Sequence, residues 1–174
     1  MALGMLGANL ITEITDDTLE ARLCELNYDT CRDAVLEDRN WSFAIKRYKY
    51  SSPLKADPVF GFSYAYAIPS EVLRVIAVND NNRQWVLEDR SILCDGSEIE
   101  VRAVIRVTDT SVFPPRFVKA LAAYLASEIA LPLTNSPAHQ QQMGNIYAAQ
   151  LVWASGNDGR QGRNTRRYSS EWIR

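Results

Sequence analysis

The sequence predicts an α+β protein that is mainly α: an antiparallel helix bundle with a small antiparallel β insertion and an extended C-terminal arm. Apolar residues recur at helical spacing near both ends of the 174-residue chain, and they alternate with a period of two in the middle. The last sixteen residues instead combine five arginines with glycine. A chain of this length usually forms one domain. We expect a folded domain at 1–156, with the bundle at about 1–40 and 114–156 and the insertion at about 41–110, followed by the arm at 157–174.

The first long helix is expected at about residues 17–38. Asp17 and Glu20 form a capping-box-like start. Two adjacent apolar stripes follow: Leu19, Leu23, Leu26, Thr30 and Ala34 form one, and Cys24, Tyr28, Cys31 and Val35 form the other. Together they are wider than the apolar face of a surface helix, so we expect neighbours to contact this helix from more than one side. A short helical piece at 2–8 should precede it and end at Gly7 and Asn9.

Short strands are expected in the middle of the chain. Aromatic residues alternate with small ones at 60–68, and Pro69 ends that strand because proline lacks a backbone donor. Residues 41–45 form a weaker strand or an extended segment. Further strands are expected at 72–78, 84–87, 91–94 and 99–107. The Asp95-Gly96 pair is a strong signal for a two-residue hairpin, and we expect one small antiparallel sheet.

Helical spacing returns after Phe113. One helix is expected at about 115–131, with alanines that allow close approach of a neighbour. Ser136 can cap a second helix with Pro137 at its first position, and Gly156 is placed to end it. No run of the sequence reaches the ~18 consecutive apolar residues of a membrane span.

Charge is divided unevenly along the chain. Residues 1–158 carry 14 basic and 20 acidic side chains, a net charge of −6, whereas residues 159–174 carry five and one, a net charge of +4. Glycines interrupt this basic segment, and its arginines alternate with Tyr168, Trp172 and Ile173. A segment too polar to fold alone but rich in arginine and aromatic residues is suited to docking on a partner.

No residue pattern predicts an active site, a metal site or a cofactor. His139 is the single histidine and its neighbours offer no acid or base. Cys24, Cys31 and Cys94 lack metal-ligand spacing, so we expect buried structural thiols. Neither glycine-rich phosphate-loop motif occurs. The aromatic run at 60–66 could stack bases, but it has no interleaved Lys or Arg, which favours a buried sheet face.

The order and spacing of several short apolar motifs resemble one known family. These motifs are WSFA at 41–44, FGFSYAYAIP at 60–69 followed by VLR at 72–74, FVKALAAYLA at 117–126, and LPLTNS at 131–136. They are similar to the head-to-tail adaptor (connector) proteins of tailed bacteriophages, also called tail tubular protein A in short-tailed phages. The resemblance extends from Leu3 to about Trp153.

The resemblance implies a structural virion protein and not an enzyme. Such proteins assemble as a ring, usually dodecameric, between the capsid portal and a downstream tail or nozzle protein. DNA passes through the channel without sequence-specific binding, and the ring is assembled in the host cytoplasm. In that family the C-terminal segment reaches the portal, and an extended arm from Asn157 could span about 60 Å. The residues that this implies for portal docking are Arg160, Arg163, Arg166, Arg167, Tyr168, Trp172, Ile173 and Arg174.

Two other classes of function stay open. A nucleic-acid-binding regulator would also explain the arginine-rich tail, although the acidic domain and the lack of a recognition helix disfavour it. An enzyme is disfavoured further, because no convergent set of catalytic side chains can be identified from the sequence.

Overall fold

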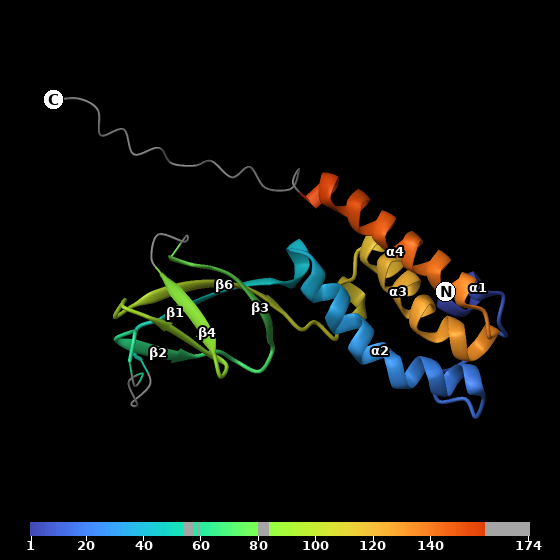
Figure 1. The fold of residues 1–174 in the computed structure, drawn as a ribbon, viewed down its shortest axis with the longest axis horizontal. Helices are drawn as coiled ribbons and strands as arrows, with labels where there is room; N and C mark the ends of the chain where they lie inside the picture. Colours follow the sequence, from blue (N-terminus) through green and yellow to red (C-terminus); the bar gives the residue numbers. More distant parts are fainter. Residues whose placement is uncertain (54–57, 59, 80–83, 159–174) are drawn as a thin grey trace.

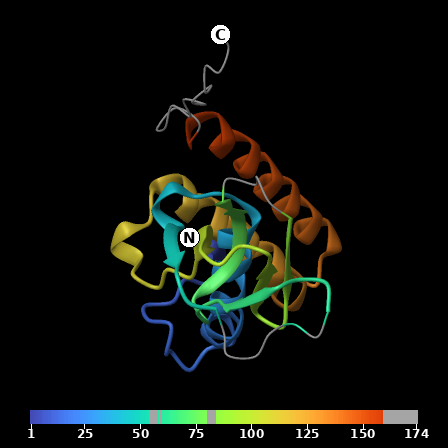
Figure 2. The same ribbon diagram turned by 90° about the vertical axis from the view of Figure 1, so that its left-hand side faces the viewer.

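The computed structural model describes residues 1–53, 58, 60–79 and 84–158. Within these residues the chain is 48% helical and 22% strand, with four helices and two antiparallel three-stranded sheets. Figure 1 shows the helices gathered at one end of the molecule and the strands at the other. In Figure 2, seen from the strand end, the sheets lie in front of the helices and the last helix follows one flank.

The fold is mixed α and β, and the prediction of a mainly α bundle with a small β insertion is wrong. The strands form two sheets that enclose a hydrophobic core of their own. This core contains Tyr66, Val72, Val75, Val78, Ile92, Cys94, Ile99, Val101 and Ala103. Alternating apolar residues identify strands but not their partners, and for that reason the sequence pattern was compatible with one small sheet.

The two sheets are built from strands that are not all neighbours in sequence. The first sheet has the order β1-β6-β3, with β1 at Ile45–Tyr50, β6 at Ile99–Ile105 and β3 at Val72–Val78. The second has the order β2-β5-β4, with β2 at Tyr64–Ala67, β5 at Ser91–Cys94 and β4 at Trp85–Glu88. β1 and β3 are therefore the two edges of the first sheet.

The expected hairpin at Asp95-Gly96 is absent, because β5 and β6 belong to different sheets. The segment instead crosses between the sheets, where Asp95 Oδ1 accepts from Ser63 and the Gly96 carbonyl accepts from the Tyr66 hydroxyl at 2.7 Å. A two-residue turn joins β4 and β5 at Asp89 and Arg90, whose φ angles are 42° and 55°. Positive φ at both central positions is typical of a type I′ hairpin, and the lack of glycine there hides it in the sequence.

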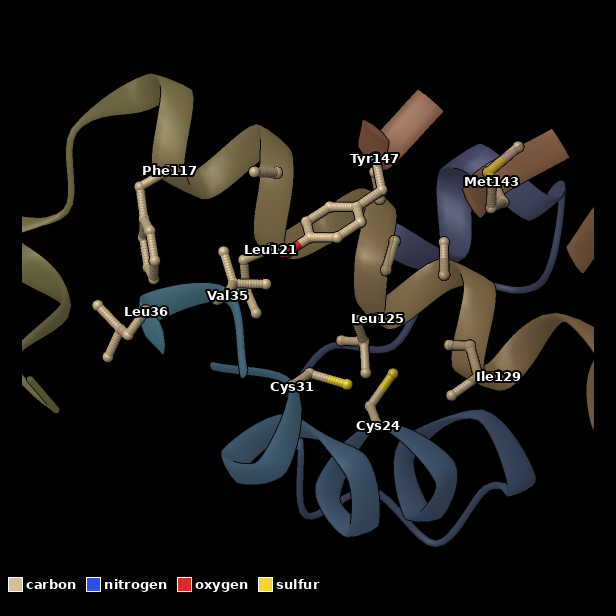
Figure 3. Packing of buried hydrophobic residues seen from close by; sticks show 14 of the residues in the cluster. Cys24, Cys31, Val35, Leu36, Phe117, Leu121, Leu125, Ile129, Met143 and Tyr147 are labelled. Carbon is tan, nitrogen blue, oxygen red and sulfur yellow. The ribbon is translucent and has the colours of Figure 1, made fainter. Parts of the chain in front are cut away.

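The helices are α1 at Ala2–Leu6, α2 at Leu19–Asp38, α3 at Pro115–Thr134 and α4 at Pro137–Asp158. α3 contacts the other three helices and is the centre of the helical layer. Figure 3 shows Cys24 and Cys31 of α2 packing beside Leu125 and Ile129 of α3. By length and composition α3 could cross a membrane, with a mean hydropathy of 1.3, but 56% of that stretch is buried inside the protein as in a core helix.

The helix ends agree with the sequence signals in part. α1 ends at Gly7, which adopts a left-handed φ of 66° as expected. Ser136 caps α4 by accepting from the backbone N–H of His139 at 3.4 Å. α2 is capped by Thr18 rather than by Asp17, and Gly156 does not end α4, which continues to Asp158. Thr18 Oγ1 accepts from the N–H of Ala21, whereas Asp17 pairs with Arg22.

α2 joins the helical layer to the first sheet. Arg74 of β3 donates from Nε to the carbonyl of Glu37 and from a terminal nitrogen to Asn40 Oδ1, at 2.8 and 2.7 Å. Trp41 follows the helix and donates from its indole nitrogen to the Val35 carbonyl at 2.7 Å. Residues 41–45, expected to be extended, contain the 3-10 turn Ser42–Ala44 before β1 begins. A second such turn, Thr110–Val112, precedes α3.

Candidate interaction surfaces

The described residues contain no group of three or more His, Cys, Asp or Glu side chains placed to hold a metal ion. His139 is exposed at the first turn of α4, and its imidazole makes no hydrogen bond within the described part of the chain. Three glutamines follow it on the exposed start of the same helix. The histidine position offers no orienting acid for nucleophilic catalysis.

All three thiols are buried and unpaired, in agreement with their expected structural role. Cys24 and Cys31 face α3 from α2, and Cys94 lies between the two sheets. Burial raises the pKa of both α2 thiols. The pKa of Cys31 rises to about 12, and the charge of Glu128 makes a smaller contribution to that increase. Because the thiolate is the reactive form, these cysteines are poor nucleophiles in the native protein.

The aromatic run at 60–66 does not form one continuous stacking surface. Tyr66 is fully buried, so the expectation of a buried sheet face is confirmed for this residue. Phe60 and Phe62 precede β2, and Phe60 is 86% exposed. The strand predicted at 60–68 was too long at its N-terminal end. The alternation of aromatic and small residues begins before Tyr64, which is the first residue of β2 that pairs with β5.

The predicted docking residues from Arg160 to Arg174 all lie outside the described residues. The described chain reaches the start of this segment through α4, which runs antiparallel to α3. Near that end Val152 and Trp153 are each 70% exposed, and the Trp153 carbonyl accepts from Arg116 at 3.5 Å. Exposed apolar side chains therefore lie next to the segment that the sequence predicts to be an arm.

The two apolar stripes of α2 have different surroundings. Cys24, Cys31 and Val35 are buried against the core, whereas Leu19 and Leu26 are 58% and 77% exposed. We call Leu19 and Leu26, together with the adjacent Arg22, Glu25 and Asp29, the α2 outer face, whereas Leu23 of the same stripe packs against the core. Neighbours within this chain thus contact α2 from α3 and, at its C-terminal part, from the first sheet, whereas Leu19 and Leu26 face outward.

The α2 outer face belongs to the most acidic part of the chain. Residues 1–40 carry nine acidic and three basic side chains, a net charge of −6, and the acidic and basic residues of 41–158 are equal in number. Asp29 and Asp33 bind the buried Arg32 through its guanidinium, with nitrogen-to-oxygen distances of 2.6 and 2.8 Å. Glu25 is exposed and makes no ion pair with a described residue.

A basic pocket of about 270 Å³ lies on the first sheet and is lined by side chains of β1, β3 and β6. Arg47 of β1 lies directly opposite Arg102 of β6, and Lys49 lies opposite Glu100. Lys49 Nζ is 3.6 Å from Glu98, whereas neither arginine forms an ion pair with a described residue. The Nε atom of Arg102 is buried and has no hydrogen-bond acceptor there. We call Arg47, Lys49 and Arg102, with Ala77 and Glu100 beside them, the basic pocket.

This pocket could not be found from the sequence pattern. In the KRYK run at 46–49 only Arg47 and Lys49 are two residues apart, and Arg102 is more than fifty positions away and reaches Arg47 only through the β1–β6 pairing. The available signal was the spacing of two between Arg47 and Lys49 in one strand and between Glu100 and Arg102 in the other, which places each pair on one face of its strand.

Comparison with known proteins gives no match, either to a family model or to a curated protein.

Proposed function

We propose that this chain is a structural subunit of a ring that connects a phage capsid portal to the tail and leaves a channel for the genome. The observation that carries the proposal is the exposure of Leu19 and Leu26 on a helix whose opposite side is fully packed. A leucine pair on an otherwise charged helix face is suited to contact with a neighbouring subunit. The motif resemblance to head-to-tail adaptors supplies the identity of the assembly.

The proposal gives separate roles to the two ends of the domain. α2 would form contacts within the ring, while α4 would carry the arginine-rich arm from the ring to the portal. Ordering such an arm on a partner costs about 2–5 kcal/mol or more, so docking is favoured when many arms bind one preassembled ring. Assembly would then begin at the portal.

The charge of the domain supports passage of DNA. A net charge of −6 on residues 1–158 opposes adhesion of a moving polyanion, provided that acidic faces line the channel. A nucleic-acid-binding regulator remains the second candidate, favoured by Arg47 and Arg102, which form no ion pair with a described residue, together with the basic arm. It predicts DNA binding that weakens steeply with salt.

Electron microscopy of the portal ring mixed with the purified chain tests the proposal. We expect an additional ring of density coaxial with the portal. The double variant Leu19→Asp/Leu26→Asp should leave incomplete rings, while Phe60→Asp, which changes an exposed aromatic residue outside α2, should not. A portal that acquires no added density with the wild-type chain would contradict the proposal.

A further inference from the structure

We propose that the basic pocket of one copy binds the acidic α2 outer face of a second copy. This inference depends on the proposed ring and specifies which two surfaces close it. The contact is heterologous, since a patch on one subunit meets a different patch on the next, and contacts of this kind form closed rings when the rotation between subunits permits.

The pocket has the chemistry of a carboxylate-binding site. Arg47 and Arg102 face each other across β1 and β6, and like charges in directly opposed positions destabilise a sheet unless a counter-charge lies between them. The buried Nε of Arg102 lacks an acceptor among the described residues. Guanidinium groups bind carboxylates through paired hydrogen bonds, so an incoming carboxylate would remove the repulsion and give the guanidinium an acceptor.

The α2 outer face offers carboxylates of the required kind. Glu25 is exposed and unpaired within the described chain, and the side chain of Asp29 is 78% exposed although one oxygen binds Arg32. Residues 1–40 hold the entire net negative charge of the domain, which directs them toward a basic partner. Leu26 is 77% exposed and follows Glu25 directly, so it adds apolar area for contact with a protein surface beside the two carboxylates.

Within one chain, the α2 outer face and the basic pocket do not contact each other among the described residues. The C-terminal part of α2 packs on the first sheet through Asp33 and Glu37, whereas Glu25 and Leu26 lie in the half of the helix that points away from the sheets (Figure 1). No hydrogen bond or ion pair joins the α2 outer face to the basic pocket among the described residues. In the proposed ring, the partner of each surface is therefore the next copy.

The test uses two full-length variants in sedimentation velocity at low salt. The pocket variant is Arg47→Glu/Arg102→Glu, and the helix variant is Glu25→Lys/Asp29→Asn, in which the new amide oxygen can still accept from Arg32. Each variant alone should associate at least tenfold more weakly than wild type. Their mixture should recover association, because the helix variant keeps the wild-type pocket and the pocket variant keeps the wild-type helix face. Glu88→Lys, an exposed change on β4, is the matched charge control.

Thermal unfolding of each variant checks that folding is intact. Recovery in the mixture also excludes misfolding as the cause of the loss, because two misfolded chains would not complement each other.

Variants that associate like wild type, or a mixture that associates no better than its components, would overturn the inference while leaving the ring itself possible. A wild-type chain that stays monomeric would overturn it too, and the connector function would then be decided by portal binding alone. DNA retardation by wild type that the pocket variant abolishes would reassign the pocket to phosphate.

Discussion

Asp33 of α2 lies 2.6 Å from the Nε atom of Arg106, the residue that follows β6. Its other carboxylate oxygen binds the guanidinium of Arg32, whose side chain is only 7% exposed. The Asp33 carboxylate thus binds both the buried Arg32 of its own helix and the half-exposed Arg106 next to β6. Asp33 therefore adds an ion pair to the junction between α2 and the first sheet, where Arg74 also donates to Glu37 and Asn40.

Removal of the two partners of this junction should have unequal effects. Asp33→Ala leaves the buried Arg32 with Asp29 alone, and we expect the free energy of unfolding to fall by about 2–3 kcal/mol. Arg106→Ala removes a partly solvated ion pair and should cost about 0.5–1 kcal/mol. Urea denaturation measures both values. Equal losses would show that Arg32 does not need Asp33.

Phe117 is the largest single contributor expected in the helical core. It is fully buried and contacts the rings of Trp41, Phe43 and Phe113, with centroid distances of 5.2, 5.1 and 4.7 Å. Phe117→Ala should lower the free energy of unfolding by about 3–5 kcal/mol. Phe60→Ala makes the same chemical change at an 86% exposed position and should stay within about 0.5 kcal/mol of wild type. Guanidinium titrations of both variants provide the comparison.

Alkaline pH should destabilise the protein through its tyrosines. Burial, followed by the hydrogen bond to Asp38, raises the pKa of the Tyr147 phenol above the ordinary value of about 10. Below that pH both states keep the proton, so the contribution of Tyr147 to stability is fully present and does not change with pH. Above it the unfolded chain loses the proton first, so the free energy of unfolding falls as pH rises.

Tyr147→Phe should remove this part of the pH dependence. The variant loses one hydrogen bond to a carboxylate and should be less stable than wild type by about 1.5–3 kcal/mol at neutral pH. Its disadvantage should shrink between pH values of about 9 and 11, because the unfolded wild-type chain then releases the Tyr147 proton that the folded chain keeps, and the wild type alone loses stability through this position. Urea midpoints across this range measure the difference. A constant gap would contradict the raised pKa.

The thiols should react only after unfolding. Native protein at a pH of about 8 should give almost no colour with a disulfide reagent, since Cys24, Cys31 and Cys94 are buried and the pKa of Cys31 is raised to about 12. Denaturant should expose three reactive groups per chain. Rapid reaction of one thiol in the native state would mean that the core opens at that position.

Local sequence signals located many elements but not the way in which the strands associate. The strands Val72–Val78 and Ser91–Cys94 and the start of α4 at Pro137 agree with the expected positions, because alternation and capping are local properties. The assignment of β5 and β6 to different sheets depends on contacts between distant residues, such as Tyr66 with Gly96. The Asp95-Gly96 signal was therefore wrong although its residues are typical of a hairpin.

The α2 outer face and the basic pocket likewise combine features that the sequence predicts with features that depend on contacts between distant residues. The apolar stripe that contains Leu19 and Leu26 was visible in the sequence, but the exposure of these two leucines was not, because spacing does not show which apolar side chains are covered. Arg47 and Arg102 form a pocket only through strand pairing. The arm residues from Arg160 onward were identified by composition, lie outside the described residues and remain a prediction.

Co-sedimentation with the portal ring of the same phage tests the connector function most directly. The full-length chain is compared with a chain that ends at Asn157, which retains nearly all of α4 and lacks the arginine-rich arm. We predict saturable binding of the full-length chain and loss of binding on truncation. If neither chain bound the portal while the full-length chain retarded DNA, the connector function would be contradicted and the nucleic-acid-binding regulator would replace it.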